Sequence, residues 1–123
     1  MRVKVYYNLH RKMFSVVSME AHDRYGRVID HRKFITLDNV GFRVNPAGRA
    51  RCRREKRKNV HAFVVGTISA VQEQWPPGWA DIVIYNPYMY KSFALKDTHR
   101  PVYAARKAWL TENYVSVVDI LKP

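Results

Sequence analysis

Seven basic residues fall within ten positions of one short segment, and their side chains are suited to binding anions. They are Arg49, Arg51, Arg53, Arg54, Lys56, Arg57 and Lys58. An arginine guanidinium presents a planar fork of donors that matches the oxygens of a phosphate. Like charges this close repel one another, and a bound anion removes that repulsion. The segment therefore predicts a phosphate site, with a solvated charged helix as the plainer alternative.

The spacing of these residues fits a helix, on which residues three and four positions apart share a face. Two sets of cations then lie on adjacent faces: Arg49, Arg53 and Arg57 on one, and Arg51, Arg54 and Lys58 on the other. A small nucleotide would use three or four of them. Nucleic acid would use more and would bind with a strong salt dependence. The sequence leaves both ligands open.

His61 follows the basic segment and could contact a phosphate or act as a general acid or base. A histidine in an expected strand is more often a buried residue with a satisfied hydrogen bond. Metal-independent RNA cleavage can use histidine, lysine, arginine and tyrosine, all of which the chain contains. A small metal-independent ribonuclease using His61 is therefore the alternative function.

An aromatic segment follows at residues 85–93. Tyr88 and Tyr90 alternate, so they would share a face in an extended chain. Aromatic rings beside a basic patch can stack on bases, and they can also simply pack a thin core. We include both tyrosines, together with His61, among the expected ligand-binding residues.

The sequence predicts no metal and no cofactor. His22 and His31 flank the turn at Gly26 and would lie opposite one another. Neither a cysteine cluster nor an HExxH pattern accompanies them, so a polar hairpin is the better interpretation. Cys52 is the one cysteine of the chain, which excludes an intrachain disulfide.

The elements that must position these residues are mostly strands. Asn45 and Pro46 are typical of a helix start, so we expect one highly basic helix over about 46–58. Strands are favoured at residues 2–7, 13–19, 60–71, 81–85 and 114–121. We expect the first two to form a hairpin and the strand at 60–71 to be central in the sheet. Ala105, Ala108 and Trp109 have the spacing of a second helix over about 102–110. The expected fold class is α+β, a mostly antiparallel sheet with one or two helices in a single domain spanning residues 1–123.

Length and charge restrict the function further. The chain has 123 residues, which is too few for a two-domain enzyme with a separate cofactor domain. Lys and Arg number 22 against 10 acidic residues, a net charge of +12, so an anionic partner is expected. No signal peptide is recognisable at the N-terminus and no run approaches the ~20 apolar residues of a membrane helix. We expect a cytoplasmic protein, or one of the host cytoplasm if the source is a virus, without a membrane partner.

Four strings of the chain resemble small accessory proteins of tailed bacteriophages. They are residues 5–10 (VYYNLH), 49–51 (RAR), 57–64 (RKNVHAFV) and 85–93 (YNPYMYKSF). The resemblance implies an accessory protein made during infection. Such proteins often bind host nucleic acid, a host enzyme or a nucleotide signal used in immunity. It implies no catalytic residues.

These observations predict a non-catalytic phosphate-anion binding protein of phage type. It would hold a nucleotide, for example to sequester an immune signal as a counter-defence, or it would hold nucleic acid. A protein inhibitor that docks its basic helix on an acidic host protein is a further alternative. An exposed strand edge would also be compatible with a homo-oligomer.

Overall fold

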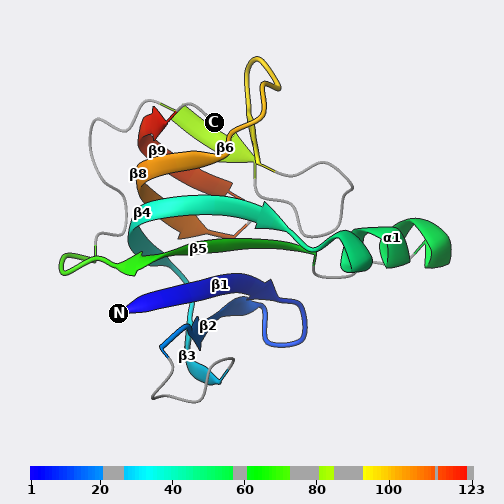
Figure 1. Cartoon of the computed structure of the whole chain (residues 1–123), viewed down its shortest axis with the longest axis horizontal. Coiled ribbons are helices and arrows are strands. Elements are labelled where there is room, and N and C mark those ends of the chain that lie inside the picture. Colours follow the sequence, from blue (N-terminus) through cyan, green and yellow to red (C-terminus); the bar gives the residue numbers. More distant parts are fainter. Residues whose placement is uncertain (21–26, 57–60, 73–80, 85–92, 113, 122–123) are drawn as a thin grey trace.

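The computed structural model describes residues 1–20, 27–56, 61–72, 81–84, 93–112 and 114–121. These residues form nine strands and one helix (Figure 1). The elements are β1 (Arg2–Asn8), β2 (Met13–Ser18), β3 (Val28–Arg32), β4 (Ile35–Val44), α1 (Pro46–Glu55), β5 (Ala62–Ile68), β6 (Asp81–Ile84), β7 (Ala94–Leu95), β8 (Ala104–Thr111) and β9 (Tyr114–Leu121). All nine strands belong to one sheet in the order β3-β2-β1-β5-β4-β8-β9-β6-β7, and neighbours run antiparallel.

The expected α+β class with one or two helices is wrong, because the described chain is largely β and has one short helix. The segment expected as a second helix, 102–110, contains most of strand β8. The basic helix is shorter than the expected 46–58. It ends at Glu55, where Lys56 turns into the left-handed conformation with φ 49°. Residues 57–60 lie outside the described residues.

A bulge in β4 changes which residues face inward. Asp38 pairs with Thr67 of β5, but Gly41 pairs with Val65, so β4 carries one extra residue between these pairs. Asn39 lies in this bulge and has a φ of 51°. The side chains that are buried on either side of the bulge, Leu37 and Val40, are therefore three positions apart rather than two.

The same spacing appears in β8, which pairs with β4 without a register shift. Ala105 and Ala108 are both fully buried and are three positions apart. In β9, which pairs with β8, Asp119 has a φ of 55° and lies between the core-packed residues Val117 and Ile120. Residues on one face of a helix also recur every three positions. This explains why the sequence of β8 has a helix-like pattern.

One hydrophobic core lies on the inner face of the sheet. Its largest fully buried apolar side chains are Phe14, Ile35, Leu37 and Leu110, with several valines. The sheet curls around this core. Tyr7 on β1 donates a hydrogen bond to Glu112 beyond β8 (Oη to Oε1, 3.3 Å), although β5 and β4 separate β1 from β8 in the sheet.

Candidate functional site

Helix α1 starts where the sequence predicts it. Asn45 is the N-cap in an extended conformation, and its side-chain oxygen accepts hydrogen bonds from the backbone N–H groups of Ala47 (3.1 Å) and Gly48 (3.3 Å). Pro46 follows as the first helical residue, a position that needs no N–H donor. The backbone N–H of Asn45 donates to the carbonyl of His61 at 2.6 Å, which fixes the helix start to strand β5.

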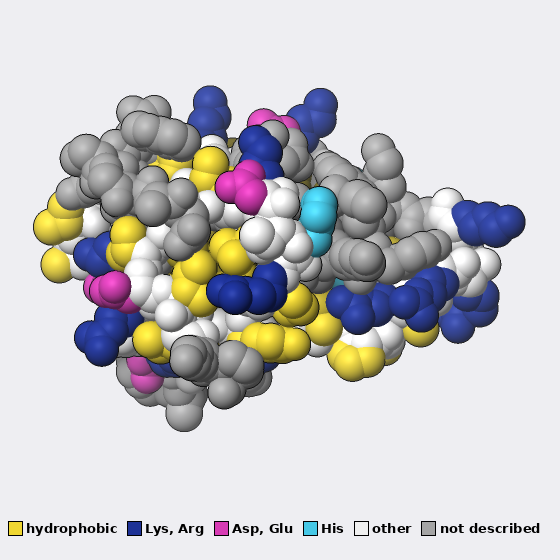
Figure 2. Space-filling view, turned by 90° about the horizontal axis from the view of Figure 1, so that it is seen from above, with side chains coloured by type: hydrophobic (Ala, Val, Ile, Leu, Met, Phe, Trp, Pro, Cys, Tyr) yellow, Lys and Arg dark blue, Asp and Glu magenta, His cyan; other side chains and the backbone are white. Residues whose placement is uncertain are grey.

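The helix projects away from the sheet as an arm (Figure 1). Only Gly48 and Cys52 of the helix are buried. Its exposed cations are Arg51, Arg53 and Arg54, with Lys56 at the C-cap, and Arg49 is half-buried. Figure 2 shows the dark-blue basic side chains gathered on this arm, and the acidic side chains visible in that view lie over the sheet.

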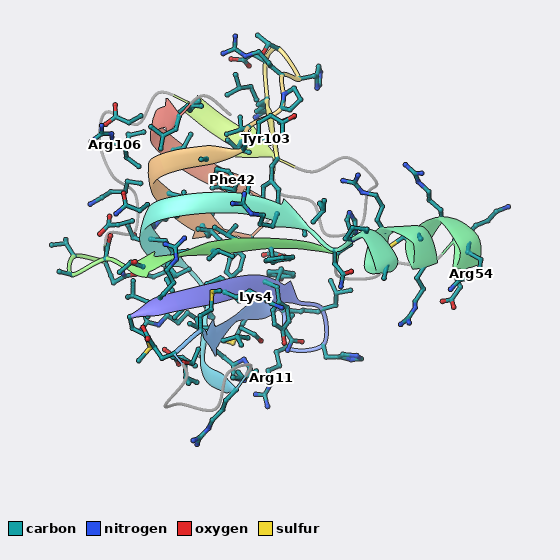
Figure 3. All side chains as sticks on the ribbon, in the orientation of Figure 1. Lys4, Arg11, Phe42, Arg54, Tyr103 and Arg106 are labelled. Atoms are coloured by element: carbon teal, nitrogen blue, oxygen red, sulfur yellow. The ribbon has the colours of Figure 1, made fainter. Side chains whose placement is uncertain are left out.

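Three of the arginines share one face of this arm. Arg49, Arg53 and Arg54, with Val44, Pro46 and Ala50, line an open hollow of about 440 Å³. The Nε atom of Arg49 is buried, and none of the described residues accepts a hydrogen bond from it. Arg54 lies on the outer part of the arm, away from the sheet (Figure 3). This arrangement presents several guanidinium groups to an incoming phosphate.

The structure brings three of the predicted ligand residues together and places a fourth, His61, apart from them. Arg49, Arg53 and Arg54 lie together on α1. The other predicted cations and the two tyrosines, Arg57, Lys58, Tyr88 and Tyr90, lie outside the described residues.

His61 lies at the root of the helix and is not part of the arginine hollow. It is 1% exposed, and its Nδ1 atom lies 3.7 Å from the Sγ atom of Cys52, which is also buried. This contact packs the helix against the start of β5. At 1% exposure, His61 presents almost no surface to an RNA phosphate, although it borders the second hollow described next.

A second hollow of about 190 Å³ lies beside the helix root. It is lined by Lys4, Tyr6, Asn45, His61, Ala62 and Phe63. Sequence reasoning missed Lys4, Tyr6 and Phe63 as candidates. The pairing of β1 with β5 brings them together, and no local pattern in the sequence predicts that pairing.

The described residues contain no group of three or more side chains able to hold a metal ion. His31 Nδ1 lies 3.1 Å from the hydroxyl of Ser15, a hydrogen bond between two strands. Its expected counterpart His22 lies outside the described residues. Among the described helices none is long and apolar enough to cross a membrane.

Comparison with known proteins supports the bacteriophage resemblance. The family model of the Mycobacterium phage L5 gene 82 protein matches residues 1–118. The Gene 82 protein of Mycobacterium phage L5 is 37% identical over 120 residues, which cover 93% of each chain. No solved structure matches the chain. The chain therefore belongs to the family of the Mycobacterium phage L5 gene 82 protein.

Proposed function

We propose that this phage protein is a non-catalytic nucleic-acid-binding protein of the host cytoplasm, and that helix α1 contacts the phosphate backbone. The observation that carries the proposal is the projecting helix itself. Its ten residues include four arginines, only Gly48 and Cys52 are buried, and Glu55 is its single acidic residue. Like charges this close repel one another, and a polyanion is the partner that relieves the repulsion most fully.

The distribution of the cations favours a polymer over a mononucleotide. Arg51 and Arg53 are two positions apart, so they point to different sides of the helix. One compact ligand in the open hollow reaches Arg49, Arg53 and Arg54 but not the whole arm. A nucleic-acid strand or duplex carries a phosphate at every step and can contact cations on several sides.

The salt dependence of binding tests the proposal. We would measure fluorescence anisotropy of a labelled duplex of about 20 base pairs between about 50 and 200 mM salt. Each phosphate contact contributes a slope of about −0.9 to the plot of log affinity against log salt concentration. The double variant Arg53→Ala/Arg54→Ala should therefore bind more weakly, with a slope smaller by about 2. Both side chains are exposed, so the fold should be retained.

A charge-matched control separates the helix from the net charge of the protein. Arg100→Ala/Arg106→Ala removes two exposed arginines that lie outside α1. This variant should keep the wild-type slope. Equal losses for the two double variants would mean that only net charge matters, and the proposal would be wrong. No binding to any nucleic acid, with a stoichiometric complex with an acidic host protein, would favour the inhibitor hypothesis instead.

A further inference from the structure

The hollow between β1 and β5 has a chemistry that differs from that of the arginine arm. Strand alternation explains which side chains reach it. Val3, Val5 and Tyr7 of β1 are buried in the core, as are Ala62 and Val64 of β5. The intervening side chains of the two strands therefore point to the outer face. Those that line the hollow are Lys4, Tyr6 and Phe63.

The pairing of the strands sets these side chains next to one another. Val5 pairs with Val64, so Tyr6 and Phe63 are the residues adjacent to this pair on neighbouring strands. Both rings are half-buried, which leaves part of their surface open. The Nζ atom of Lys4 lies over the Phe63 ring, 4.9 Å from its centroid, so a base that stacks on this face displaces the ammonium. Two aromatic rings and a cation thus share one small concave surface.

Asn45 adds a polar group to the rim of the hollow. Its side-chain oxygen caps the helix, as described above. Its side-chain nitrogen donates no hydrogen bond to any residue in the described ranges, and the residue is exposed. An amide donor beside aromatic rings can bond to the edge of a base that stacks there.

The hollow and the arginine arm are continuous along the chain. Asn45 lines the hollow, and the next residue, Pro46, lines the arginine hollow. Lys4 lies on β1, in the central part of the sheet, and Arg54 lies far out on the arm (Figure 3). A strand whose phosphates follow α1 can therefore place a base against the sheet.

We propose that this hollow stacks an unpaired nucleobase on Phe63 and Tyr6, which makes the protein selective for single-stranded nucleic acid. The inference rests on the proposed function and adds the class of substrate. Bases within a duplex are already paired and stacked, so they cannot enter the hollow. Aromatic stacking tolerates any base because each has a π-face, so we expect little sequence preference.

Phe63→Leu tests the proposal, because leucine keeps an apolar side chain but removes the ring. The probes are a labelled oligothymidylate, an abasic oligonucleotide of the same length, and a duplex. Phe63→Leu should weaken oligothymidylate binding roughly tenfold and should leave the abasic and duplex affinities unchanged. Tyr103→Leu removes a 49% exposed ring outside the hollow and should change none of the three.

The abasic probe keeps the test decisive even if Phe63→Leu fails to fold. Wild-type protein should bind oligothymidylate roughly tenfold more tightly than the abasic strand. Equal affinities for these two probes would overturn the stacking site, as would equal losses of single-stranded and duplex binding in Phe63→Leu. In either case the helix proposal would survive if Arg53→Ala/Arg54→Ala still weakened all three probes. If that double variant changed none of them, the helix proposal itself would be wrong.

Discussion

A methyl group added to Gly66 would lie 2.8 Å from the Cγ1 atom of Val40, on the neighbouring strand. The backbone oxygen of Asp38 and the Cβ atom of Leu37 would lie at 3.2 Å. These atoms lie in the β4 bulge or directly beside it, where the backbone and the buried side chains cannot move aside easily. Gly66→Ala should therefore lower the free energy of unfolding by about 1–3 kcal/mol, the usual range for overpacking. Urea unfolding followed by circular dichroism would measure the change.

Gly41→Ala is the matched control for this prediction. The three atoms nearest to a methyl group there all belong to the guanidinium of Arg43, at 2.9–3.0 Å. That group is the far end of a flexible, exposed side chain, so it can shift at little cost. We expect a change within about 0.5 kcal/mol. If both variants lost stability equally, the close packing at the bulge would not be the cause.

The bulge also marks the limit of what the sequence could predict about the fold. The hairpin of residues 2–7 and 13–19 is confirmed as the antiparallel pair β1 and β2. The central position of the segment at 60–71 is confirmed by β5, which lies between β1 and β4. Both predictions rest on local alternation. The helix expected at 102–110 is wrong because the spacing of Ala105 and Ala108 follows the bulge of β4, a partner strand that lies far earlier in the sequence.

The candidate site also consists of a part that the sequence predicts and a part that it does not. Arg49, Arg53 and Arg54 could be predicted because helical spacing is a local property, and Asn45 and Pro46 announce the helix start. The hollow on the sheet could not be predicted. Tyr6 and Phe63 become neighbours only through strand pairing, and neither stands in a recognisable motif.

The N-cap gives a prediction for the stability of the arm. Asn45→Ala removes the oxygen that accepts from the N–H groups of Ala47 and Gly48. The variant should lose about 1 kcal/mol of stability, measured by urea unfolding. Asn45→Asp keeps an acceptor at the same place and adds a favourable charge at the helix N-terminus, so it should lose little or nothing. Equal losses in the two variants would show that the cap contributes nothing.

Asp30 gives a prediction for the effect of pH. The side-chain hydrogen bond from Arg32 (2.6 Å) lowers the pKa of the Asp30 carboxyl below its ordinary 3.8, with a smaller lowering from the His31 backbone N–H and partial opposition from burial. A lowered pKa in the folded state stabilises the fold at pH values above about 4, and the contribution is lost as the carboxyl is protonated below that. The two side chains are 35% and 44% exposed, so solvent screens the pair and Asp30→Asn should lose no more than about 0.5 kcal/mol at pH 7.

The comparison variant for Asp30 is Asp97→Asn, which removes an exposed carboxylate for which the described residues provide no ion pair. Both variants raise the net charge by one, so their difference isolates the contact with Arg32. Urea unfolding should show Asp30→Asn as the less stable variant at pH 7. The difference in free energy of unfolding between the two variants should disappear at about pH 2. A gap that persisted in acid would contradict the assignment.

The buried thiol of Cys52 reports whether the arm stays docked on the sheet. Its Sγ atom is packed against His61, and the residue is 2% exposed. A thiol reagent can reach it only when the helix separates from β5. The reaction with Ellman's reagent should therefore be roughly a hundredfold slower in the native protein than in urea. Cys52→Ala/Arg54→Cys moves the single thiol to an exposed position of the same helix, and it should react at the unfolded rate. If native Cys52 reacted as fast as this exposed thiol, the arm would not be held by the Cys52–His61 contact. The arginines would then be carried by a mobile segment rather than by a fixed one.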